Sequence, residues 1–160
     1  MHLCRDNGVK MSKGKEKTSN LSKNVLLKLS GLGRNFGVPE GVEVFYPGEY
    51  HFKNGTHYVL YDESSDAEGT VLDTKCILKM NEDRVEVIKH GAVSTNMIFE
   101  VGSPSVSFYQ TGFGELSVAT NVRSLEFVEE EHLLRADMLY TLEINNDYAE
   151  ECHLTLTVTD

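Results

Sequence analysis

The chain has 160 residues, 40% of them hydrophobic, and a formal net charge of −10 at pH 7. This length suits one domain that buries a core without disulfides or a structural metal. No run approaches the roughly 18 apolar residues needed to span a bilayer, and the N-terminus lacks the apolar core of a secretion signal, so we expect no membrane segment. The odd count of three cysteines, without a CxxC spacing, argues against a disulfide framework and a zinc site and favours a cytoplasmic location.

The charge is unevenly distributed along the chain. Residues 1–24 hold six basic and two acidic side chains, whereas the remainder holds nine basic and 23 acidic ones. Such an acidic body would repel phosphate backbones, which argues against a nucleic-acid partner. We predict a disordered basic tail over residues 1–23, within which Met11 is an alternative start, and a single domain over residues 24–160.

From residue 24 onward, short apolar-alternating runs are separated by turn residues, which predicts strands. The first run covers residues 24–31, with Val25, Leu27 and Leu29 on one face. The clearest local signal follows at 48–62, where Asn54-Gly55 supplies the two residues that a type I′ hairpin turn needs. Pairing Lys53 with Thr56 then places Tyr50 opposite Val59 and Phe52 opposite His57, so that Tyr50, Phe52, Val59 and Tyr61 share one face.

The remaining runs predict further hairpins. Residues 72–80 and 84–90 form one, with Leu72, Cys76, Leu78 and Met80 on one side, and residues 93–101 form the next strand. Residues 105–111 and 115–122 are joined by Gly112-Phe113-Gly114, with Val106 and Phe108 on one strand and Leu116 and Val118 on the other. A strand over 124–130 and a long hairpin over 134–158, turning at 145–147, complete about ten strands.

So many consecutive hairpins would leave two exposed edges in an open sheet, and closure removes them. We therefore predict an all-β, antiparallel, up-and-down barrel of about 8–10 strands, in preference to a sandwich. A barrel of this size is either filled by side chains or holds one small ligand.

Several chemically suggestive segments have simpler interpretations. The glycines of GLGRNFG (31–37) lack the spacing of a nucleotide-binding loop and are not followed by a helix pattern. We therefore interpret them as residues that end the preceding strand. The acidic DESSDAE segment (62–68) lacks the ligand order of a calcium loop and is predicted to be a solvated loop. Residues 129–134, EEEHLL, contain good helix formers but are also predicted to be a loop.

No catalytic or metal-binding set stands out. Cys152 and His153 are neighbours on a predicted strand and point to opposite faces, so they cannot share an ion, and Cys152 is predicted to be a core thiol. The other histidines are scattered singly, and no serine lies in a nucleophile elbow. The convergence of two carboxylates, or of a histidine with a carboxylate, cannot be read from one sequence. We therefore predict no cofactor, and an enzyme is the least supported hypothesis.

Five polar side chains could anchor a ligand if they face the barrel interior, and they would otherwise simply line its outside. They are Arg84, Lys89, His90, Tyr109 and Tyr140.

Four strings resemble a known family: NVLLKL (24–29), GEYHFKNGTHYVLYDE (48–63), EVIKHGAVSTNMIFEVG (86–102) and YQTGFGEL (109–116). They are similar to the YwiB-like family of small bacterial proteins, a domain of unknown function with a calycin-like or lipocalin-like β-barrel. The family's Thr-Pro-Tyr-Gly turn appears here as residues 111–114, Thr-Gly-Phe-Gly. The resemblance implies a fold and carries no activity, ligand or catalytic residue.

Two functions remain open at this point. The first is a non-catalytic barrel that binds a small, partly apolar molecule, with seven Tyr and seven Phe available to line a pocket. The alternative is a protein–protein interaction module or homodimer that uses an outer sheet face or the basic tail.

Overall fold

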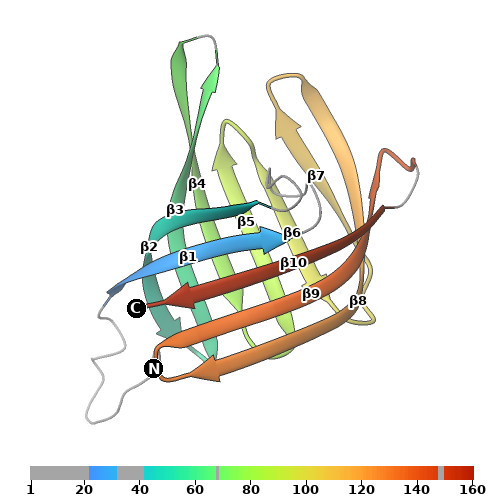
Figure 1. Ribbon diagram of the computed structural model, residues 1–160. Helices are drawn as coiled ribbons and strands as arrows, with labels where there is room; N and C mark the ends of the chain where they lie inside the picture. The colour runs from blue at the N-terminus through green and yellow to red at the C-terminus, as the bar shows by residue number, and fades with distance from the viewer. Residues whose placement is uncertain (1–21, 32–41, 68, 148–149) are drawn as a thin grey trace.

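The computed structural model describes residues 22–31, 42–67, 69–147 and 150–160. Ten antiparallel strands form one sheet that curls into a nearly closed barrel, in the order β6-β5-β4-β3-β2-β1-β10-β9-β8-β7 (Figure 1). The strands are β1 (Lys23–Gly31), β2 (Glu43–Lys53), β3 (Thr56–Ala67), β4 (Thr70–Met80), β5 (Arg84–Gly91), β6 (Thr95–Glu100), β7 (Ser105–Thr111), β8 (Gly114–Glu130), β9 (Leu133–Ile144) and β10 (Glu150–Thr159). The predicted fold class and strand number are confirmed. Residues 1–21 of the predicted tail and the glycines Gly33 and Gly37 lie outside the described residues, and Lys23, the last residue of the predicted tail, begins β1.

The hairpin register predicted at Asn54-Gly55 is confirmed. Both turn residues have positive φ, and Lys53 pairs with Thr56, as a type I′ turn requires. Tyr50 accordingly faces Val59 across the ladder, and the side chains of this face point into the barrel. The register is fixed because a slip by one residue would turn the whole apolar set toward water.

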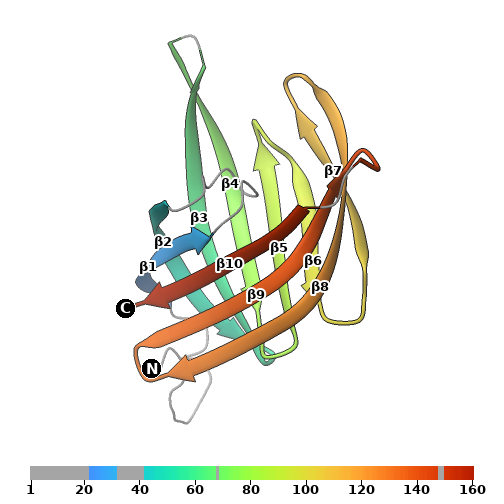
Figure 2. The ribbon, with the colours of Figure 1, turned by 45° about the vertical axis from the view of Figure 1, so that its right-hand side comes forward.

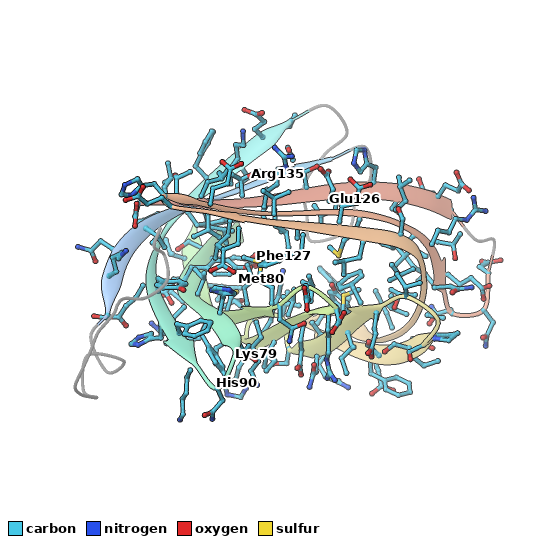
Figure 3. The ribbon with its side chains drawn as sticks, turned by 90° about the horizontal axis from the view of Figure 1, so that it is seen from below. Lys79, Met80, His90, Glu126, Phe127 and Arg135 are labelled. Carbon is cyan, nitrogen blue, oxygen red and sulfur yellow. The ribbon has the colours of Figure 1, made fainter. Side chains whose placement is uncertain are left out.

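The core is built from the alternation that the sequence predicts. Every strand contributes inward side chains, and the deepest of them, Leu27, Val59, Val85, Phe99, Leu134, Ala136, Met138 and Val158, are wholly buried. Figure 3 shows Met80 and Phe127 inside the ring of strands and Lys79 and His90 outside it. Leu72 differs from the prediction: it is 40% exposed, because it lies near the tip of the β3–β4 hairpin, which extends beyond the other strands (Figure 2).

Two predicted loops are wrong. The acidic segment continues β3 as far as Ala67, where Asp62 pairs with Lys75 and Glu63 with Thr74. Within this ladder Lys75 of β4 partly compensates the Asp62 charge, since its Nζ lies 3.2 Å from an Asp62 carboxylate oxygen. Residues 129–134 likewise form the end of β8 and the start of β9, joined by a turn at 131–132.

The two strands predicted at 115–122 and 124–130 are one strand, β8, interrupted by a bulge between Val122 and Ser124. The extra residue changes which positions face inward. Val118, Thr120 and Val122 face the interior before the bulge, whereas Leu125, Phe127 and Glu129 share the inward-facing parity after it. The bulge therefore directs an acidic side chain toward the interior.

The sheet is discontinuous between β6 and β7. Two isolated bridges, Ser94–Gln110 and Val101–Val122, join the two sides. The Phe99 and Tyr140 rings also meet across this seam, edge to face, with centroids 5.0 Å apart. The seam is thus packed, although it lacks a regular ladder.

A chain of polar contacts lies at the end of the barrel opposite the tip of the β3–β4 hairpin. The Tyr50 hydroxyl lies 2.7 Å from His57 Nδ1, and His57 Nε2 lies 3.4 Å from a Glu129 carboxylate oxygen. His57 is 3% exposed and packs between the Phe52 and Phe127 rings. Burial lowers the pKa of His57, and the Glu129 carboxylate partly offsets this shift. His57 is therefore neutral at pH 7, and its contacts connect β3 to β8 across the interior.

Gly91→Ala should destabilise the fold by about 2 kcal/mol, because Gly91 has a φ of +148° and an added Cβ would meet the Asp73 carbonyl oxygen and lie 2.8 Å from Thr74 Cα. The matched control is Gly112→Ala, where an added Cβ meets nothing within 4 Å. That change should alter the free energy of unfolding by less than about 1 kcal/mol. Urea denaturation of both variants measures the difference, and equal effects would contradict the assignment of Gly91 as a packing constraint.

The free energy of unfolding should fall as the pH is lowered from about 7 to about 5. The unfolded chain protonates His57 near its ordinary pKa of about 6.5, whereas the folded state keeps it neutral to lower pH, so the unfolded state binds more protons in this window. His57→Gln should reduce this decline, and His90→Gln, on the outer face of β5, should leave it unchanged. Urea midpoints at the two pH values test this, and an unaltered decline in His57→Gln would refute it.

Candidate functional site

A buried ion pair distinguishes one end of the barrel interior. On β5, Val85, Val87 and Lys89 alternate inward, so the last of them brings an ammonium into the barrel. Lys89 Nζ lies 3.1 Å from both carboxylate oxygens of Glu63. The side chains are only 4% and 17% exposed. Removing one partner of such a pair costs about 3–5 kcal/mol, because the other charge is left uncompensated.

Glu63 is a site residue that the sequence interpretation missed. The sequence pattern predicts a solvated loop at this residue, yet Glu63 continues the inward series of Val59 and Tyr61 along β3. The alternation of inward and outward residues along β3, continued past Asp62, would have identified Glu63 as an inward-facing side chain. A charged side chain at an inward position requires a buried partner, which Lys89 provides.

Aromatic and thiol groups surround the pair. The Tyr46 and Tyr61 rings lie 5.0 Å apart. Burial, reinforced by the Glu63 and Cys76 charges, raises the pKa of Tyr46 to about 12, and burial likewise raises the pKa of Tyr61 and Tyr109. Burial and Glu63 raise the pKa of the Cys76 thiol to about 11. All four groups are therefore protonated and uncharged at neutral pH.

The seam between β6 and β7 completes this region. The Tyr109 hydroxyl donates to Met97 Sδ at 2.8 Å. Thr95, which pairs with Lys89 in the β5–β6 ladder, and Ser107 on β7 are 7% and 4% exposed. Their hydroxyl oxygens are buried and have no hydrogen-bond partner among the described residues. Unpaired buried hydroxyls are rare, because leaving them unpaired costs free energy.

We call this region the upper interior, because it lies toward the end of the barrel that carries the tip of the β3–β4 hairpin. It consists of Tyr46, Tyr61, Glu63, Cys76, Lys89, Thr95, Met97, Ser107 and Tyr109. Tyr46 and Tyr109 are only partly buried, in contrast to the wholly buried side chains deeper in the barrel.

The five side chains named from the sequence do not form one set. Lys89 and Tyr109 lie in the upper interior, whereas Tyr140, on β9, is buried against the Phe99 ring of β6 and is not part of that region. Arg84 and His90 occupy the alternate positions of β5 and lie on its outer face, where Arg84 pairs with Glu86 at 3.3 Å. Of the five residues, Lys89, Tyr109 and Tyr140 therefore face the barrel interior. The period of two separates His90 from its neighbour Lys89.

The upper interior holds no activated nucleophile among its described side chains. A thiol with a pKa of about 11 is a poor nucleophile at neutral pH, and the lysine is held by a carboxylate. No group of three or more His, Cys, Asp or Glu side chains in the described ranges could hold a metal ion. The described residues also contain no helix with the length and hydrophobicity needed to cross a membrane.

Comparison with known proteins places the chain in a family. A family described as "Domain of unknown function (DUF1934)" matches residues 33–156. The "Uncharacterized beta-barrel protein YwiB" of Bacillus subtilis (strain 168) is 28% identical over 133 residues, which cover 83% of this chain and 91% of the relative.

The crystal structure of the ywiB protein from Bacillus subtilis superimposes with a TM-score of 0.68 at 23% identity, covering 86% of this chain and 92% of that one. This likeness supports the barrel fold. The family match extends over most of the barrel, from the segment before β2 to β10. The chain therefore belongs to the DUF1934 family, whose members include an uncharacterised β-barrel protein.

Proposed function

We propose that this protein is a non-catalytic barrel that binds one small, partly apolar molecule at the upper interior. The observation that carries the proposal is the cluster of buried polar groups at one end of the barrel, two of which have no hydrogen-bond partner among the described residues. Binding sites for small molecules typically combine an apolar lining with a few convergent polar groups. The calycin-like interpretation belongs to this proposal, because barrels of about eight strands can hold one small ligand.

Two partly exposed aromatic side chains support the choice of this end of the barrel as the binding site. Tyr46 and Tyr109 point toward the interior yet remain partly exposed, so their rings contact both solvent and the core. An aromatic ring in that position offers a large apolar contact area together with a hydroxyl. The opposite end is occupied by the chain of Tyr50, His57 and Glu129. A cytoplasmic location is part of the proposal, and it is consistent with the free, buried thiols of Cys76 and Cys152.

Native mass spectrometry of freshly purified protein should show a population carrying one small non-covalent adduct. Tyr109→Ala should weaken retention about tenfold, because it removes a ring from the upper interior. Tyr58→Ala is the matched control, since Tyr58 lies on the outer face of β3, where Lys79 Nζ is 5.6 Å from its ring centroid. The proposal is overturned if the wild-type protein carries no adduct and thermal-shift screening against metabolites finds no stabilising compound.

A second candidate function, a homodimer, is favoured by one observation. Val106 and Phe108 alternate on the outer face of β7, beside the seam, and are 64% and 52% exposed. Large apolar side chains gathered on an outer face mark interaction surfaces.

If β7 forms a dimer interface, the wild-type protein should sediment as a dimer at high micromolar concentration. Val106→Thr/Phe108→Thr should then sediment as a monomer, because it removes the apolar contact while keeping the strand pattern. Leu139→Thr, at another exposed apolar position on β9, is the control. A monomeric wild-type protein would exclude this function.

A further inference from the structure

Lys89 and Glu63, the ion pair of the upper interior, compensate each other's charge. Lys89 Nζ is equidistant, at 3.1 Å, from the two oxygens of Glu63, so its charge is already compensated by a partner that is also largely buried. An incoming anion would have to compete with this carboxylate and leave it unpaired in a poorly solvated place. An incoming cation would have to compete with the ammonium in the same way. Both exchanges are unfavourable, because a buried charge is tolerated only when it is paired.

The other groups around the pair add no charge. The Tyr46 and Tyr109 hydroxyls and the Cys76 thiol stay protonated at neutral pH, for the reasons given above. The upper interior therefore has no net charge, although the protein as a whole has a net charge of −10.

Two groups in this region nevertheless lack a partner. Thr95 and Ser107 are more than nine-tenths buried, and their hydroxyl oxygens make no hydrogen bond within the described part of the protein. They lie on β6 and β7, the two strands that meet at the seam, close to the Tyr109–Met97 contact. Each hydroxyl can donate one hydrogen bond and accept up to two. A bound molecule with a neutral polar group would satisfy them and place its apolar part against Met97 and the Tyr109 ring.

We propose that the upper interior selects uncharged molecules, which hydrogen-bond to Thr95 and Ser107 through a neutral polar group such as an amine N–H, hydroxyl or amide. This inference rests on the proposed function, since it specifies the ligand class of the same site. Lys89 and Glu63 act in it as a compensated pair that disfavours charged ligands.

A matched pair of fluorescent probes tests the selection. N-phenyl-1-naphthylamine and 1-anilinonaphthalene-8-sulfonate share one ring system and differ by a sulfonate. Wild-type protein should bind the uncharged probe at least about tenfold more tightly. Glu63→Gln leaves the Lys89 charge without its carboxylate, and should shift the affinity ratio toward the sulfonate by about tenfold or more. Comparing ratios between variants removes the effect of the sulfonate's size.

A second set of variants locates the probe. Thr95→Val/Ser107→Ala removes both hydroxyls at nearly constant volume, and should weaken the uncharged probe about tenfold. Thr141→Val, on β9 at a partly exposed position of alternate parity to buried Tyr140, should not change its affinity. If Glu63→Gln fails to fold, Glu63→Gln/Lys89→Met replaces the pair by uncharged groups. The uncharged probe should then bind within about threefold of its wild-type affinity, because the pair contributes no attraction to it.

The outcomes separate this inference from the function on which it rests. An adduct in native mass spectrometry, together with equal affinity for both probes and no change of ratio in Glu63→Gln, would overturn the selection and leave small-molecule binding standing. Unchanged binding in Thr95→Val/Ser107→Ala would overturn the hydrogen-bonding role of the seam. A protein that carries no adduct, gains no stability from metabolites and binds neither probe would overturn both proposals.

Discussion

The pairing of β1 with two neighbours is the constraint on which the barrel depends. Leu27 lies opposite Tyr46 of β2 in one register and opposite Val158 of β10 in the other. Without β1, the strands β2–β6 and β7–β10 would be two separate sheets, each with an uncovered apolar face. With it, all ten strands share one interior, and every inward side chain must be apolar or find a partner there.

The polar groups of this interior meet that requirement in two ways. At one end, His57 is neutral and is held between a tyrosine hydroxyl and a carboxylate. In the upper interior, a full ion pair is retained and the tyrosines around it are kept protonated. Both arrangements avoid an unpaired charge in a poorly solvated place. They differ in the hydroxyls of Thr95 and Ser107, which have no hydrogen-bond partner among the described residues and on which the proposed binding site rests.

Local chemistry made much of the fold predictable from the sequence. The Asn54-Gly55 turn set the β2–β3 register, and the period of two identified most of the core. The site was less accessible, because it depends on interruptions of that pattern. Glu63 was missed because a run of acidic residues resembles a loop, although its ladder with β4 continues. Glu129 was missed because the β8 bulge changes the inward parity.

Other features could not be read from any one segment. The position of Lys89 follows from β5 alone, but its partner comes from β3, so their contact depends on the pairing of both strands with β4. Arg84 and His90 were grouped with Lys89 by residue type, whereas alternation along one strand separates them. The seam between β6 and β7 could not be predicted from the sequence either, because both strands have ordinary alternating patterns and only their pairing is irregular.

The strand order also has a consequence for folding. Among the described strands, each ladder joins consecutive elements of the chain, except that of β1 with β10, which brings together residues more than a hundred positions apart. The nearby pairings close short loops, whereas this one must overcome the entropy of a very long loop. Two preformed meanders joining in a late step is the expected route. Glu63, Lys89 and Thr95 belong to the first meander, and Ser107 and Tyr109 to the second. The groups of the proposed site therefore come together as one set only when the two meanders join, so binding of the proposed ligand would report completed folding.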